Sequence, residues 1–187
     1  MELADGSVRK RRRAYDLPRV AHELTWTCYR RLRLLGQERT RQWLIDAMDR
    51  ARRVHDLALL AYVVMPEHVH VLVWSRRDPY TVASILKSIK QPVARRAIAH
   101  LRVHGPAHLE RLRVARTDGR IEHRFWHQGG GYDRNLLTRK SIAFSINYIH
   151  NNPVRRGLCA RPVDWRWSSA AAYRGEPSGP LAVERWG

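Results

Sequence analysis

The stretch LALLAYVVMPEHVHVLVW, residues 57–74, contains two apolar runs separated only by Pro66 and Glu67. Both runs are rich in aliphatic residues, many of them β-branched, as buried strands are. Within sheets, proline is confined to strand ends, edges and bulges, so Pro66 marks a break between two strands. The stretch therefore predicts two adjacent strands at the centre of a sheet, joined as a hairpin or a bulged pair.

Helical spacing of apolar residues flanks this pair of strands. It extends over residues 38–55 and over residues 80–100, where lysine and arginine occupy the positions between. Each segment predicts an amphipathic helix that packs on the sheet. Pro92 is expected to kink the second helix or to end its first part. Residues 104–120 have mixed polarity and turn-forming residues, and predict an irregular connection.

The remaining segments complete the predicted order of strands and helices. Residues 22–32 and 122–128 are rich in aromatic and β-branched residues and predict a first and a fourth strand, the latter followed by a glycine turn. A last helix is predicted over about residues 138–151, ended by Pro153. The order predicts an α+β fold: a ferredoxin-like βαββαβ sheet with helices on one face and a C-terminal helix.

Charge and length limit the classes of function. The 187 residues fit one domain, and 35 Lys and Arg against 17 Asp and Glu give a net charge of +18. Such a charge favours a polyanionic partner, and nucleic acid is the leading candidate. The alternative is that the charge serves only to keep the protein soluble. Two distant cysteines predict no disulfide framework, and no segment reads as a membrane span or a secretory signal. We expect a soluble, cytoplasmic protein with no membrane partner.

The chain is expected to divide into three parts. Residues 1–19 include the basic run SVRKRRRAY and predict a flexible arm that lies along phosphates or is simply solvated. Residues 20–175 form the predicted domain, and residues 176–187 a C-terminal tail.

Two histidines interrupt the second central strand. His68 and His70 are two residues apart, so they point to the same face of the sheet while Val69 and Val71 point to the other. Neighbouring imidazoles can hold a divalent metal. The alternative is a pair of hydrogen-bonded histidines on a sheet face.

A second polar pair lies on the last predicted helix. Tyr148 and Asn152 are four residues apart, so a phenol and an amide share one helical face. A tyrosine on an inner helical face is more often a core residue. Beside a metal and a basic groove, it is instead a candidate nucleophile.

Four segments carry a family resemblance: AYVVMPEHVHVLV, RFWHQGGGYDRNL, INYIHNNPVRRGL and DWRWSSAAAY. In this order and spacing they resemble the single-tyrosine HUH transposases, an IS200-like group, and specifically the REP-associated tyrosine transposases. The resemblance covers about residues 20–173. It implies an enzyme that cleaves and rejoins single-stranded or hairpin DNA through a 5′-phosphotyrosine, with a divalent metal ion, Mg²⁺ or Mn²⁺.

The resemblance also assigns roles to residues. His68 and His70 match the metal-binding pair and Tyr148 the nucleophile, while Asn152 matches a third metal ligand, with His150 and Asn151 near enough to compete. Two departures are Glu67, where many relatives have Asn, and the three glycines before Tyr132. These departures could alter metal preference or loop shape.

Basic and aromatic side chains near these motifs are candidates for DNA contact. Arg134 could instead form a structural ion pair, as could Asp133, and the DWRWSSAAAY segment is expected to cover the catalytic helix. The rival function is that of a domesticated transposase, a non-catalytic nucleic-acid-binding module of ferredoxin-like fold. The protein is expected to be either a monomer or a homodimer. The predicted DNA-binding residues are Lys87, Lys90, Arg95, Arg134, Arg155, Arg156 and Trp126.

Overall fold

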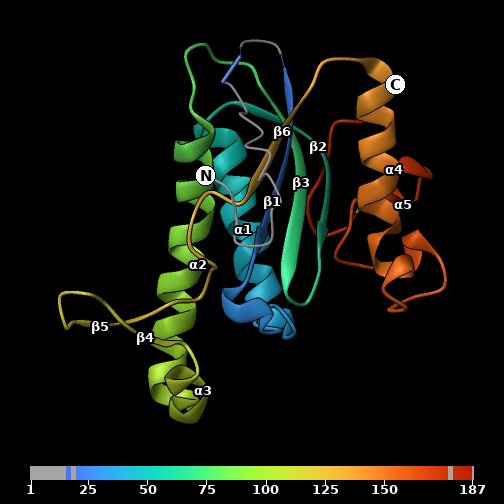
Figure 1. The fold of residues 1–187 in the computed structure, drawn as a ribbon. Coiled ribbons are helices and arrows are strands. Elements are labelled where there is room, and N and C mark those ends of the chain that lie inside the picture. The colour runs from blue at the N-terminus through green and yellow to red at the C-terminus, as the bar shows by residue number, and fades with distance from the viewer. Residues whose placement is uncertain (1–15, 18–19, 177–178, 187) are drawn as a thin grey trace, which may run out of the picture.

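One four-stranded antiparallel sheet organises the fold. The computed structural model describes residues 16–17, 20–176 and 179–186. The strands are β1 (Ala21–Thr27), β2 (Leu57–Val64), β3 (His68–Ser75) and β6 (Tyr132–Leu136), in the order β2-β3-β1-β6 (Figure 1). The two strands predicted within residues 57–74 are β2 and β3, which pair in antiparallel fashion with one register shift. The strand order is ferredoxin-like, so the predicted α+β class is confirmed.

Helices cover both faces of this sheet. α1 (Glu38–Val54) and α2 (Val82–His104) pack on one face, and α4 (Arg139–Arg155) lies against the other (Figure 1). Because side chains alternate along a strand, Val71 of β3 enters the core with α1 and α2, whereas its neighbour Leu72 packs in the cluster with α4. The expected arrangement of two helices on one face and a separate C-terminal helix is present.

The fourth strand of the sheet lies later in the chain than predicted. β6 occupies the segment expected to be the end of a glycine turn, and it pairs with β1. Within the predicted strand, residues 122–128, the extended part belongs to β5 (Ile121–His123), which pairs with β4 (Arg113–Ala115) in a separate two-stranded sheet. The aromatic residues that suggested a strand, Phe125 and Trp126, are buried core side chains.

Neither proline ends its helix where the sequence suggested. α2 runs through Pro92 and α4 runs through Pro153. Proline removes one N–H donor from a helix, but α4 continues past Pro153 to Arg155, and the Arg156 N–H donates to the Asn152 carbonyl at 3.1 Å. The Leu158 N–H then donates to the Pro153 carbonyl at 2.9 Å and closes the C-terminal end of the helix. Asn152 therefore lies inside a regular helix.

Two connections also differ from expectation. The first strand ends at Thr27 rather than at residue 32, and a short 3-10 helix, η1 (Tyr29–Arg31), follows it. Residues 104–120 are not irregular throughout, because α3 (Pro106–Glu110) and β4 lie within them.

The chain after α4 covers the outer edge of β2. This segment contains η2 (Pro162–Asp164) and α5 (Ala170–Tyr173). The Val64 N–H donates to the Trp167 carbonyl at 2.8 Å, and the Tyr173 hydroxyl donates to the Leu60 carbonyl at 2.9 Å. Leu181, in the predicted tail, is buried in the core. An open strand edge invites pairing with other chains, so this segment protects the sheet as well as contacting α4.

Asp16 and Leu17 are the described residues of the predicted N-terminal arm; the rest of residues 1–19 lies outside the described residues. The Asp16 carboxylate accepts a hydrogen bond from the Val82 N–H at 3.0 Å, and the Leu17 carbonyl accepts one from the Tyr80 hydroxyl at 2.7 Å. Both contacts fix the start of α2. Among the described residues, no helix is both long enough and apolar enough to cross a membrane.

Candidate active site

A cleft of about 340 Å³ opens between the sheet and α4. The strands contribute Thr25, His68 and His70, and α4 contributes Tyr148 and Asn152. The predicted metal pair, nucleophile and third ligand therefore meet in one place, although they come from elements far apart in the chain.

The sequence of α4 explains why Tyr148 and Asn152 face this cleft. Thr138 and Ser141 form a capping box that fixes the start of the helix. Ile142, Ile146 and Ile149 form a buried stripe against the sheet, and this stripe sets the rotation of the helix about its axis. Tyr148 and Asn152 lie to one side of the stripe and so point along the sheet surface toward the histidines.

His70 is held in a neutral form by its two hydrogen bonds and its burial. Its Nδ1 lies 2.8 Å from the Thr25 hydroxyl, and its Nε2 lies 3.1 Å from the amide nitrogen of Asn152. An amide nitrogen only donates, so Nε2 is the accepting nitrogen and Nδ1 carries the proton. Burial, with a smaller contribution from His68, lowers the pKa of His70 to about 3. The Nε2 lone pair therefore accepts the Asn152 N–H in this structure, and a metal ion bound to His70 would have to replace that hydrogen bond.

His68 is oriented by a carboxylate. Its Nδ1 lies 3.2 Å from Oε1 of Glu67, and the same oxygen accepts a hydrogen bond from the Arg156 guanidinium at 2.9 Å. Burial lowers the pKa of His68, and the neighbouring Glu67 opposes this effect. The two imidazole rings meet edge to face with centroids 4.9 Å apart. A carboxylate on the outer nitrogen of a histidine is a common support for a metal ligand.

The donor set fits a divalent metal ion. The side-chain oxygen of Asn152 is buried and has no hydrogen-bond partner within the described part of the chain. An unpartnered buried oxygen is costly unless a ligand satisfies it. No group of three His, Cys, Asp or Glu side chains suited to a metal occurs among the described residues. The two imidazoles and this amide oxygen are therefore the candidate ligands, and the carboxylate of Glu67 lines the same cleft.

Tyr148 lies beside the histidines and beneath a cation. Its ring meets the His70 ring edge to face with centroids 5.6 Å apart, and the Arg155 guanidinium carbon lies 4.9 Å from the Tyr148 ring centroid. Arg156 also lines the cleft. A phosphodiester entering here would meet two guanidinium groups next to the phenol.

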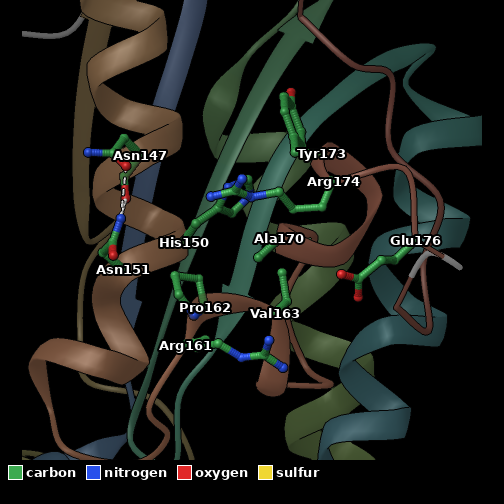
Figure 2. A pocket seen from close by; sticks show the side chains of 10 residues that line it. All are labelled: Asn147, His150, Asn151, Arg161, Pro162, Val163, Ala170, Tyr173, Arg174 and Glu176. Atoms are coloured by element: carbon green, nitrogen blue, oxygen red, sulfur yellow. Dashed lines mark hydrogen bonds between the residues drawn. The ribbon is translucent and has the colours of Figure 1, made fainter.

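The two competitors of Asn152 point elsewhere. His150 lies 2.9 Å from the Ser169 hydroxyl, and Asn151 donates to the Asn147 side chain at 2.8 Å. Both line a separate cavity of about 640 Å³ between α4 and the C-terminal segment (Figure 2). Although this cavity is larger, it contains neither His68 and His70 nor Tyr148.

The predicted DNA-binding residues divide between the two faces of the sheet. Arg134, Arg155 and Arg156 line the clefts on the α4 side. The basic residues of α2 belong to the opposite layer (Figure 1), and the ammonium group of Lys90 donates to the Gly129 carbonyl at 2.9 Å. Lys87, Lys90 and Arg95 therefore do not join the site.

Trp126, one of the predicted DNA-binding residues, is not exposed for contact with DNA. It is 7% exposed, its ring meets that of Trp26 edge to face, and its indole N–H donates to the Lys90 carbonyl at 2.8 Å. Asp133 and Arg134 each contact a residue of β1: the Asp133 carboxylate lies 2.9 Å from Nδ1 of His22, and Arg134 forms an ion pair with Glu23 at 3.3 Å.

Sequence reasoning missed the supporting roles of Thr25 and Glu67. Glu67 was noted as a departure from the family pattern, and its position next to His68 was the available signal. Thr25 could not be assigned, because its contact with His70 depends on the pairing register of β1 and β3, in which these two residues are direct partners.

Comparisons with known proteins identify the family to which the chain belongs. The family model described as "Transposase IS200 like" matches residues 18–152, and the chain belongs to this family of transposases. A Haemophilus influenzae protein named as a REP-associated tyrosine transposase is 22% identical over 158 residues, which cover 81% of this chain and 82% of that protein. The resemblance predicted from the motifs is thus confirmed.

A solved structure has the same fold. It is a REP-associated tyrosine transposase bound to a REP hairpin, and it matches with a TM-score of 0.66 at 20% sequence identity, covering 95% of this chain and 94% of its own.

Proposed function

We propose that this transposase cleaves and rejoins one DNA strand by covalent catalysis, with Tyr148 as the nucleophile. The observation that carries the proposal is the meeting of Tyr148 and Asn152 with His68 and His70 in one cleft. Membership of the transposase family supports a DNA-processing enzyme; the phosphotyrosine step and the use of a metal ion are our inference.

In the proposed step, the Tyr148 oxygen attacks the phosphorus of a backbone phosphodiester. A bond forms between the phenolic oxygen and phosphorus, and the bond from phosphorus to the 3′ oxygen breaks. The phenol gives up its proton, and the departing 3′ oxygen ends as a hydroxyl. The strand is then held as a 5′-phosphotyrosine, and attack by a 3′-hydroxyl in the reverse direction rejoins it.

The basic residues of the cleft orient and stabilise the phosphate. Arg155 lies over the Tyr148 ring and Arg156 is held by Glu67, so both guanidinium groups can pair with phosphate oxygens as negative charge develops. His68, His70 and the Asn152 oxygen would hold a divalent metal, Mg²⁺ or Mn²⁺, which when bound supplies Lewis-acid polarisation of a phosphate oxygen.

The proposed substrate is single-stranded or hairpin DNA. The net charge of +18 favours a polyanion, and the solved relative of the same fold is bound to a REP hairpin. The Arg-lined cleft lies at the protein surface, where a single strand can lie along it.

The test is formation of a covalent protein–DNA adduct. The protein is incubated with Mn²⁺ and labelled hairpin DNAs from its own genomic surroundings, and the products are separated under denaturing conditions. Tyr148→Phe should abolish the adduct, because it removes the attacking oxygen and keeps the ring. Tyr29→Phe, which removes a phenol outside the cleft, should form the adduct normally.

His70→Ala should also abolish the adduct if the metal site is required. Tight binding of the hairpins by every variant, with no adduct from the wild-type protein, would instead support a non-catalytic DNA-binding module.

A further inference from the structure

A second cleft, of about 310 Å³, adjoins the proposed active site along α4. It shares Thr25, His70 and Tyr148 with the first cleft, so the two form one continuous depression. The residues that belong to the second cleft alone are Glu23, Tyr132, Arg134, Phe144 and Ser145. The proposed function makes no use of them.

Phe144 is the first unusual feature of this second cleft. It lies one helical turn before Tyr148 on α4 and is 64% exposed, whereas the other phenylalanine of the chain, Phe125, is 2% exposed. Nothing in the core requires an aromatic ring at this exposed position. A flat apolar ring at the mouth of a cleft is a surface on which another flat ring can stack.

The charged pair in the second cleft provides little net attraction for a phosphate. Glu23 is buried and pairs with Arg134 at 3.3 Å, so a carboxylate and a guanidinium largely cancel one another. The first cleft, in contrast, presents Arg155 and Arg156. The phosphate of a bound strand is therefore favoured in the first cleft, and an uncharged part of the strand in the second.

Two buried polar atoms of the second cleft have no hydrogen-bond partner in the described part of the chain. The hydroxyl of Ser145, a residue that is 1% exposed, and the Nε of Arg134 are both buried without a hydrogen-bond partner among the described residues. Burial of an unpaired polar group is unfavourable, and a ligand that supplies the missing bond gains affinity. The edge of a nucleobase carries hydrogen-bond acceptors and donors suited to both groups.

We propose that the second cleft binds one nucleobase of the DNA strand, unstacked from its neighbours, within two nucleotides of the phosphate that Tyr148 attacks. One face of the base stacks on Phe144, and its edge points toward Ser145 and Arg134. This inference rests on the proposed function and adds a residue that positions the substrate. Because a single strand is already partly unstacked, extrusion of one base costs little.

The test measures the coupling between Phe144 and a single base. Dissociation constants are measured in the Tyr148→Phe background, which cannot cleave, for the cognate DNA and for versions with one abasic nucleotide at each position around the cleavage site. Stacking of a base on an aromatic side chain corresponds to roughly 5- to 150-fold in affinity. One abasic position should therefore weaken binding by this factor, and the same position should have little effect when Phe144→Ala is added.

Phe144→Trp should restore the sensitivity to that abasic position, since it restores a stacking surface. Val103→Ala is the matched control, because it shortens an apolar side chain that is 73% exposed on α2, outside both clefts. It should leave every dissociation constant unchanged. Thermal unfolding midpoints confirm that the variants are folded.

An equal loss of affinity for intact and abasic DNAs on Phe144→Ala, or no loss for any of them, overturns the base site. In that case a Tyr148-dependent adduct would leave the proposed function intact. Conversely, coupling between Phe144 and one base in a protein that forms no adduct would support the base site and reject the cleavage mechanism.

Discussion

The amide nitrogen of Asn152 lies 3.1 Å from Nε2 of His70, although the two residues are 82 positions apart in the chain. This contact joins α4 to the centre of the sheet. It also places Tyr148, one turn earlier on the same helix, against the His70 ring. The position of the proposed nucleophile and the geometry of the proposed metal site therefore depend on the same helix packing.

Asn152→Ala should weaken Mn²⁺ binding, because it removes the buried amide oxygen that has no protein partner among the described residues. We expect a loss of about 10- to 100-fold, as for other groups that complete or support a metal site. Calorimetric titration of the metal-free protein with Mn²⁺ measures it. Asn151→Ala is the control, since Asn151 pairs with Asn147 outside the cleft; equal affinities for the two variants would exclude Asn152 as a ligand.

Glu67→Gln should weaken the metal site without unfolding the protein. The substitution keeps the shape of the side chain but removes the charge that orients His68 and holds Arg156. A loss of about 10-fold in Mn²⁺ affinity is expected. Glu184→Gln, which alters an exposed ion pair with Arg76 just past the opposite end of β3 from Glu67, should bind Mn²⁺ like the wild type. An unchanged affinity in Glu67→Gln would remove Glu67 from the site.

Gly131→Ala should destabilise the fold by about 3 kcal/mol. Gly131 has a φ of +84°, and a Cβ there would lie 2.2 Å from the Thr25 carbonyl oxygen. The substitution therefore pushes the start of β6 away from β1. A Cβ at Gly130 would have no neighbour within 4 Å, so Gly130→Ala should have nearly wild-type stability. Urea unfolding compares the two, and equal stabilities would contradict the close approach.

His150 should make stability depend on pH. Burial lowers the pKa of His150 to about 4, from 6.5, so between these values the unfolded chain binds a proton that the folded protein does not. The stabilising effect is complete above pH 6.5 and is lost as the pH falls toward 4, by up to about 3 kcal/mol.

His150→Gln, which does not titrate, should show a weaker pH dependence. The difference in unfolding free energy between wild type and variant should shrink by about 2 kcal/mol from pH 7 to pH 5. Parallel curves of unfolding free energy against pH would show that His150 is not held neutral by burial.

The strands and helices that bury apolar side chains could be predicted from the sequence, and so could the residues that meet in the candidate site, although the family resemblance supplied their proposed roles. The period-two pattern around His68 and His70 and the helical spacing of Tyr148 and Asn152 are local signals. β6 could not be recognised in this way, because it is an edge strand with polar residues on both faces. Asp133 on one face pairs with His22 and Arg134 on the other pairs with Glu23, and neither partner can be inferred without the strand register.

At Trp126 and at Pro153 a local signal was present but misleading. An aromatic residue in a connection looks like a strand residue or a surface for stacking, but Trp126 fills the core from a loop. Pro153 has a strong local tendency to end a helix, yet α4 continues past it to Arg155, and Asn152 and Pro153 are both buried. In both cases tertiary packing overrides the local preference.

The central claim is that Tyr148 forms the covalent bond to DNA. The most direct measurement is protease and nuclease digestion of the adduct, followed by mass-spectrometric identification of the peptide that carries a nucleotide. The account predicts that the nucleotide is attached through its 5′ phosphate to Tyr148 in the peptide that also contains Asn152. Attachment to any other residue, or cleavage of the DNA with no nucleotide on the protein, would contradict it.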